Sequence, residues 1–214
     1  MALDIGHSRA SPGSTSARGV SEFEYNLRLA QQVSAALSGA GFTAQTMIGA
    51  TGAAIGLADR TALAKQAGAV LFLSLHHDSV QQHYLQTWDV DGKSQRYSTR
   101  FSGYSVFTSA LNAQATASLA FAGLLAQGMR QQGMVPSLHH AEPIPGENRP
   151  LLDARTGLYR FDQLAVLLEA AIIVNPDDEL RVRSGEVGRR VSAAVVGAVR
   201  EFCGRALPVV KPPA

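Results

Sequence analysis

The sequence of 214 residues contains little cysteine, little charge and no long apolar run. Its single cysteine, Cys203, excludes an internal disulfide framework and a cysteine-based zinc site. Because Cys203 falls within an apolar helical pattern, we expect it to be buried filler and not a nucleophile. Charged residues make up 17% of the chain and the net charge is +2, so no nucleic-acid partner is expected. No apolar run is long enough to predict a transmembrane helix.

The length and hydrophobic content of the chain favour a single α/β domain. With 46% hydrophobic residues, a chain of this length can bury a sizeable core. We predict one domain over residues 1–207 and a disordered tail at 208–214. No charged-then-apolar signal segment precedes the first predicted strand, so we expect any leader to lie outside this sequence.

Apolar runs alternate with helical patterns along the chain. This order predicts a single three-layer αβα domain with a mixed, mostly parallel central sheet of about six strands. Strands are predicted near 2–5, 42–48, 70–75, 103–108 and 164–168. Helices are predicted near 22–38, 57–68, 109–132 and 185–203, and a further helix is predicted to begin at 176. The polar segment 80–102 is an insertion in which Asp91 and Gly92 favour a hairpin, and 134–150 is a long loop.

Three predicted strands end in residues that bind metals or transfer protons. His7 follows the first strand, His76 follows the strand at 70–75, and Glu169 follows the strand at 164–168. Because the carboxyl ends of parallel strands share one edge of a sheet, these residues are expected to form one site. His77 should point to the opposite face from His76, because side chains alternate along a strand.

A catalytic zinc site uses three ligands from His, Asp or Glu and keeps one position open. Glu22 and Glu24 both lie at the start of the first predicted helix, and helical periodicity does not choose between them. A capping role for either is the alternative. The more common role of an isolated histidine is a hydrogen-bonded core or loop residue, and His139 and His140 fit a solvated loop. Burying an unpaired carboxylate is costly, so Glu169 is hard to explain as a structural residue.

Six motifs occur in an order and spacing that together identify a family. They are 4–8 (DIGHS), 22–27 (EFEYNL), Arg60 with Ala67, 73–79 (LSLHHDS), 103–107 (GYSVF), and 164–169 (LAVLLE) with Asn175. This set resembles the zinc-dependent N-acetylmuramoyl-L-alanine amidases of the amidase 3 family over nearly the whole chain. The sequence departs from the usual family pattern at Ser8, where glycine is common, and at His77 and Asp78, where alanine and asparagine are common.

The resemblance implies a function and a ligand set. Zn²⁺ would be held by His7, Glu22 and His76, and Glu169 would be the catalytic carboxylate. Glu22 is favoured over Glu24 because the family's ligand glutamate is followed by asparagine and leucine at the spacing of Asn26 and Leu27. The domain at 1–207 would be a catalytic amidase domain acting on peptidoglycan or muropeptides in the periplasm or cell envelope, hydrolysing the amide between N-acetylmuramic acid and L-alanine.

Two other functions compete with the amidase interpretation. A zinc peptidase on a similar α/β scaffold would use the same ligand types, and a non-catalytic wall-binding module would keep the fold without needing Glu169. The segments 80–102 and 134–160 are longer than the family minimum, but neither has the apolar pattern of a plugging helix. We therefore expect turnover without a partner, with an activator protein as the possible exception. No substrate-binding residue is assigned.

Overall fold

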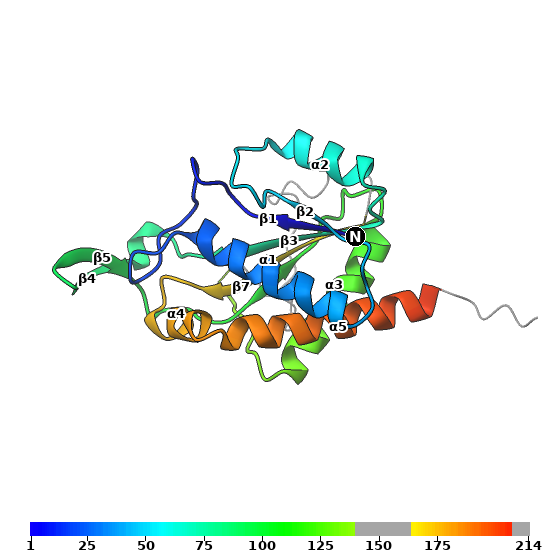
Figure 1. The fold of residues 1–214 in the computed structure, drawn as a ribbon. Coiled ribbons are helices and arrows are strands. Elements are labelled where there is room, and N and C mark those ends of the chain that lie inside the picture. The colour runs from blue at the N-terminus through cyan, green and yellow to red at the C-terminus, as the bar shows by residue number, and fades with distance from the viewer. Residues whose placement is uncertain (140–163, 207–214) are drawn as a thin grey trace, which may run out of the picture.

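The computed structural model describes residues 1–139 and 164–206 and contains one central sheet (Figure 1). Its strand order is β2-β1-β3-β7-β6, in which the first four strands are parallel and β6 is antiparallel to β7. The strands are β1 (Ala2–Ile5), β2 (Thr46–Ile48), β3 (Leu71–Asp78), β6 (Ser105–Phe107) and β7 (Leu164–Ile172). The predicted mixed, mostly parallel sheet is confirmed, with five strands where about six were expected.

Helices cover both faces of this sheet and make three layers (Figure 1). Helices α1 (Glu22–Gly39), α3 (Ala115–Gln131) and α5 (Glu186–Ala206) pack on one face, and α2 (Leu57–Gln66) packs on the other. The short α4 (Pro176–Arg183) and the 3-10 turn η1 (Gln82–Tyr84) lie at the ends of strands. Among the described residues, no helix has the length and apolar character needed to cross a membrane.

Strand β3 shows why the central strands appear in the sequence as unbroken apolar runs. Leu71, Leu73 and Leu75 belong to the large core beneath α1, α3 and α5. Phe72 belongs to the smaller cluster on the α2 face. Because both faces are buried, apolar side chains are needed toward either face, and the buried Ser74 is accommodated by its hydrogen bond to Asp4.

The predicted hairpin is confirmed as β4 (Gln86–Val90) and β5 (Lys93–Tyr97). Asp91 and Gly92 form its turn with φ values of 53° and 75°, the left-handed conformation that a two-residue hairpin loop requires. The hairpin projects from the edge of the sheet at which β1 and β3 end (Figure 1). Trp88 holds it there by donating to the Ala17 carbonyl at 2.8 Å.

Several predicted boundaries were wrong. Strand β7 does not end at Glu169 but continues to Ile172, and β3 includes both histidines and Asp78. Strand β2 covers only the last part of the predicted 42–48 run. Helix α3 starts at Ala115 and not near 109, where the Ser109 hydroxyl accepts a local hydrogen bond from the Leu111 amide. Such local bonds compete with helix formation.

Cys203 also differs from its prediction, because it is exposed. Helix α5 buries Val191, Val195 and Val199 against the core, and the cysteine lies beyond that apolar stripe. The predicted tail at 208–214, most of the 134–150 loop, and His140 and Glu142 lie outside the described residues.

Candidate active site at the carboxyl edge of the sheet

His7 follows β1 and has a backbone φ of 69°, an uncommon conformation for a residue with a side chain. A buried arginine holds the chain in this shape. Arg60 donates to the backbone carbonyls of Ile5 at 2.7 Å and His7 at 2.8 Å, and it also pairs with Asp4. The other oxygen of Asp4 accepts from the Ser74 hydroxyl at 2.7 Å. This buried network fixes the end of β1 and therefore the base of the His7 side chain.

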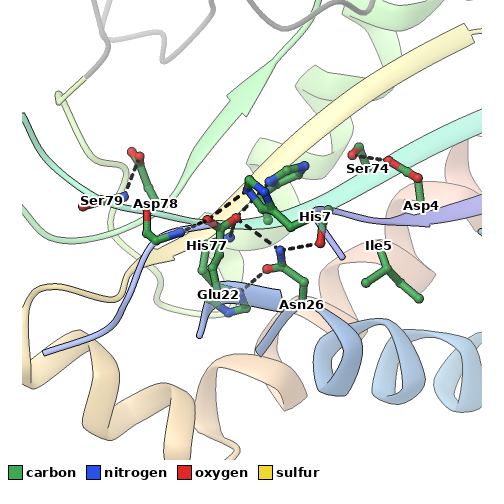
Figure 2. Close-up of polar contacts among 12 residues, drawn as sticks. Asp4, Ile5, His7, Glu22, Asn26, Ser74, His77, Asp78 and Ser79 are labelled. Carbon is green, nitrogen blue, oxygen red and sulfur yellow. Dashed lines mark hydrogen bonds and ion pairs between the residues drawn. The ribbon is translucent and has the colours of Figure 1, made fainter. Parts of the chain in front are cut away.

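Glu22 is the first residue of α1, and two histidines converge on its carboxylate. His7 Nε2 lies 3.1 Å from Oε2, and His76 Nδ1 lies 2.9 Å from Oε1. Figure 2 shows Glu22 among the neighbouring polar side chains. Glu24, the alternative ligand, is 51% exposed and pairs with Arg28 on the helix surface. The structure thus brings Glu22, and not Glu24, to the strand-end histidines.

The charges of the Glu22 group follow from this arrangement. Burial alone would raise the pKa of Glu22, but hydrogen bonds from His7 and His76 and their positive charge lower it below its usual value. The hydrogen bond with Glu22 raises the pKa of His7. The carboxylate is therefore ionised, and in the metal-free chain it stabilises a proton on His7.

The donor atoms of His7, Glu22 and His76 lie within 4.8 Å of one another. Two imidazole nitrogens and a carboxylate oxygen are the donor types that bind catalytic zinc, at about 2.0–2.2 Å each. The His–Glu separations of 2.9 and 3.1 Å are close to those of neighbouring ligands around one such ion. The His7 side chain is 32% exposed, so the group is open to solvent on one side. These residues fit a zinc ion.

Two glycines make room for the donor group. A Cβ on Gly6 would lie 2.3 Å from the His76 ring, and one on Gly13 would lie 2.4 Å from Glu22 Oε2. Gly13 also has a φ of 75°. Its neighbour Ser14 donates its backbone N–H to Glu22 Oε2 at 3.0 Å. Sequence reasoning missed these contacts, for which the local signal is the proline-glycine pair at 12 and 13.

His77 lies on the opposite face of β3 from His76, as the alternation of side chains predicts. It is buried against α1, with its ring 5.7 Å from that of Tyr25 and its Nδ1 2.8 Å from Asn26 Oδ1. Burial lowers the pKa of His77 to about 4. The imidazole is therefore neutral at neutral pH.

Glu169 occupies the position on β7 that is paired with His76 on β3. Its Oε2 is buried and has no hydrogen-bond partner among the described residues. Burial, together with the negative charges of Asp78 and Glu22, raises the pKa of Glu169 well above its usual value. These surroundings favour the protonated, neutral form of the carboxyl group.

A cleft of about 450 Å³ extends from the two histidines along the α2 face of the sheet. Its wall combines the buried Asp4 and Arg60 with the apolar side chains of Ile55, Phe72 and Leu167. Such a volume is in the range of small-molecule sites. His139 does not line this cleft, and its ring packs 4.7 Å from that of Phe101.

Comparison with known proteins agrees with the motifs. The family profile described as N-acetylmuramoyl-L-alanine amidase matches residues 1–201, whereas no curated protein sequence matches the chain. The amidase Ami1 of Mycobacterium smegmatis is 21% identical, with a TM-score of 0.74 and coverage of 95% of this chain and 96% of that chain. AmiC2 of Nostoc punctiforme is 19% identical, with a TM-score of 0.70 and coverage of 95% and 96%.

A third solved structure is of a complex. The CwlD amidase of Clostridioides difficile, determined with the GerS lipoprotein, is 14% identical, with a TM-score of 0.70 and coverage of 95% of this chain and 98% of that chain. These likenesses show that the fold is shared. The profile match spans nearly all of the sequence, and the chain belongs to the N-acetylmuramoyl-L-alanine amidase family, amidase 3.

Proposed function

We propose that this protein is a zinc-dependent hydrolase that cleaves the amide bond between N-acetylmuramic acid and the L-alanine of the stem peptide in peptidoglycan. Family membership supports the amidase activity. The observation that supports the zinc site is the convergence of His7 Nε2 and His76 Nδ1 on the two oxygens of Glu22.

In this proposal His7, Glu22 and His76 hold the ion. When bound, zinc would increase the acidity of the attacking water and polarise the scissile carbonyl. The Arg60 network keeps His7 in place, and Ser14 and Asn26 orient the Glu22 carboxylate. Orientation of ligands by such neighbours commonly sets metal affinity.

Glu169 carries the proton. Its carboxylate accepts a proton as water adds to the carbonyl carbon and then donates that proton to the nitrogen as the carbon–nitrogen bond breaks. An amide nitrogen leaves poorly unless it is protonated, so one group that performs both transfers accelerates the reaction. The orphan Oε2, buried beside the His76 position, supports this role.

The test combines metal analysis with product identification on purified muropeptides. The wild type should contain about one zinc per chain and release peptides that begin with L-alanine, whereas His76→Ala should lose both properties. Release of fragments cut within the stem peptide would instead support the zinc peptidase alternative. Binding without any cleavage would support the wall-binding module.

The proposal also covers the need for a partner protein and the location of the enzyme in the cell. We expect turnover without a partner protein, although the CwlD structure contains the GerS lipoprotein and the segment at 140–163 lies outside the described residues. A zinc-loaded chain that stays inert until another protein is added would overturn this expectation. Because the substrate belongs to the cell wall, we also propose an extracytoplasmic location, in the periplasm or cell envelope, testable by fractionation.

A further inference from the structure

The buried pair of His77 and Asn26 lies directly behind the Glu22 carboxylate. Asn26 is fully buried, and Figure 2 shows it between Glu22 and His77. Its Nδ2 donates to Glu22 Oε1 and to the Gly6 carbonyl, both at 3.2 Å. Its Oδ1 lies 2.8 Å from His77 Nδ1. All the hydrogen-bonding groups of this amide are thus engaged inside the protein.

The chemistry of the neighbours fixes which way the Asn26 amide points. The carboxylate of Glu22 and the carbonyl of Gly6 accept hydrogen bonds but cannot donate them. Only the NH₂ end of Asn26 can face both, so its oxygen must face His77. An amide oxygen only accepts, and His77 Nδ1 must therefore carry a hydrogen and donate it.

This donation has a consequence for Glu22. If His77 did not donate, the Asn26 oxygen would be buried without a partner, which costs free energy. The amide could reduce this cost by rotating or by admitting water, and either change would weaken its donation to Glu22 Oε1. The other oxygen, Oε2, is held separately by the Ser14 amide at 3.0 Å. Through Asn26, the His77 side chain therefore supports one of the contacts to Oε1, beside the contact from His76 Nδ1 at 2.9 Å.

We propose that His77 is a positioning residue that sets the zinc affinity of the His7, Glu22 and His76 group, by donating from Nδ1 to Asn26 and thereby keeping Asn26 on Glu22 Oε1. This inference rests on the proposed function, since it concerns the ion that this group would hold. It assigns no contact between His77 and the ion or the substrate.

Three substitutions separate the hydrogen bond from the bulk of the ring. Asparagine places its amide nitrogen two bonds from Cβ, the position of Nδ1 in histidine, so His77→Asn keeps the donor. Glutamine places its nitrogen one bond further out, the position of Nε2, so His77→Gln loses it although its side chain is larger. His77→Ala removes both donor and ring. His83→Ala, at an exposed histidine of η1, is the matched control.

Zinc dissociation constants are measured by competition with a chromophoric chelator, and the fold of each metal-free variant is followed by thermal unfolding. We expect His77→Ala and His77→Gln to bind zinc about tenfold more weakly, the lower end of the range for groups that orient metal ligands. We expect His77→Asn and His83→Ala to bind it like the wild type. In NMR spectra of the metal-free wild type, a hydrogen should be found on His77 Nδ1.

The results that would contradict the proposed function differ from those that would contradict only the role of His77. A wild type that binds no zinc would overturn the proposed function and this inference together. A wild type that binds zinc, with His77→Ala less stable but unchanged in affinity, would overturn only this inference and reduce His77 to a core residue. Equal affinities for the asparagine and glutamine variants would show that donation from the Nδ1 position is not what matters.

Discussion

Two carboxylates at one edge of the sheet, Glu22 and Glu169, have opposite surroundings. Glu22 accepts hydrogen bonds from the Ser14 amide and Asn26 and contacts two histidines. Glu169 has a buried oxygen with no hydrogen-bond partner in the described part of the chain. The pKa of Glu22 is lowered and the pKa of Glu169 is raised. This difference in pKa supports the proposed roles of Glu22 as a charged ligand and Glu169 as a proton carrier.

The local backbone explains the difference. Glu22 opens α1, where the helix dipole favours a negative charge, and the backbone N–H of Ser14 in the preceding loop donates to its carboxylate. Glu169 lies inside β7, which pairs with β3 on one side and with β6 at Ser105 on the other. The ladders use the backbone N–H groups on both sides of that strand. A carboxylate at a helix start is thus stabilised as an anion, while one in the middle of a central strand is not.

The largest expected effect comes from neutralising the helix-start carboxylate. Glu22→Gln should lower zinc affinity by more than about a hundredfold, because loss of a ligand should exceed the 10- to 100-fold cost of losing a group that only orients one. The matched control is Glu24→Gln, which changes an exposed side chain two residues away and should keep zinc. Zinc content after dialysis measures both. Zinc retained by Glu22→Gln but lost by Glu24→Gln would reverse the ligand assignment.

The same Glu→Gln change at Glu169, the carboxylate in β7, should separate zinc binding from catalysis. Glu169→Gln keeps the size of the side chain but cannot accept a proton, so zinc content and fold should persist. Release of L-alanine-bearing peptides should fall at least ~10²-fold, the lower end of general acid/base effects. If zinc-loaded Glu169→Gln turned over nearly normally, the proton would be carried elsewhere, with His140 or Glu142 as the next candidates.

Asp4 extends the comparison to a buried carboxylate that has a charged partner. Both Arg60 and Asp4 are almost fully buried. Arg60→Ala would leave Asp4 buried and unpaired and should lower the free energy of unfolding by about 3–5 kcal/mol. The exposed pair of Arg28 and Glu24 is the control, and Arg28→Ala should cost less than about 1 kcal/mol. Urea denaturation measures both, and similar values would contradict the importance of burial.

The sequence predicted the parts of the site that depend on strand ends and failed where contacts depend on tertiary packing. Apolar runs followed by His7 and His76 located the carboxyl edge, and the structure brings both histidines to Glu22. Periodicity could not choose Glu22 over Glu24, because the choice depends on how α1 docks against β1 and β3. Family resemblance supplied that choice.

Other features had no local signal. The apolar run before Glu169 predicted a strand that ends there, yet β7 continues through three more residues because Ala170 and Ile172 are also buried. The contact of Ser14 with Glu22 and the donation from His77 to Asn26 join residues 8 and 51 positions apart. Side-chain partners at such separations follow from packing, which a single sequence does not display.

The smallest expected effect is a pair of opposite pH slopes in the metal-free protein. Glu169 has a raised pKa in the folded state, so its contribution to stability is fully present below its unfolded pKa, about 4.5, and is lost as pH rises through the folded pKa. Glu22 has a lowered pKa, so its contribution is present above about 4.5 and is lost as pH falls.

Urea denaturation with a chelator present, repeated from well below pH 4.5 to above neutral pH, isolates each group by subtraction. The stability of the wild type relative to Glu169→Gln should decrease as pH rises. The unfolded wild type releases the Glu169 proton at a lower pH than the folded protein does, and the glutamine variant has no such proton. Relative to Glu22→Gln it should increase over the acid part of the range, because only the wild type gains an anion held by His7, His76 and the Ser14 amide. Parallel curves for the wild type and Glu169→Gln would mean that the Glu169 carboxyl is solvated in solution. The distinction between a charged ligand and a buried proton carrier would then have to rest on the activity of the variants alone.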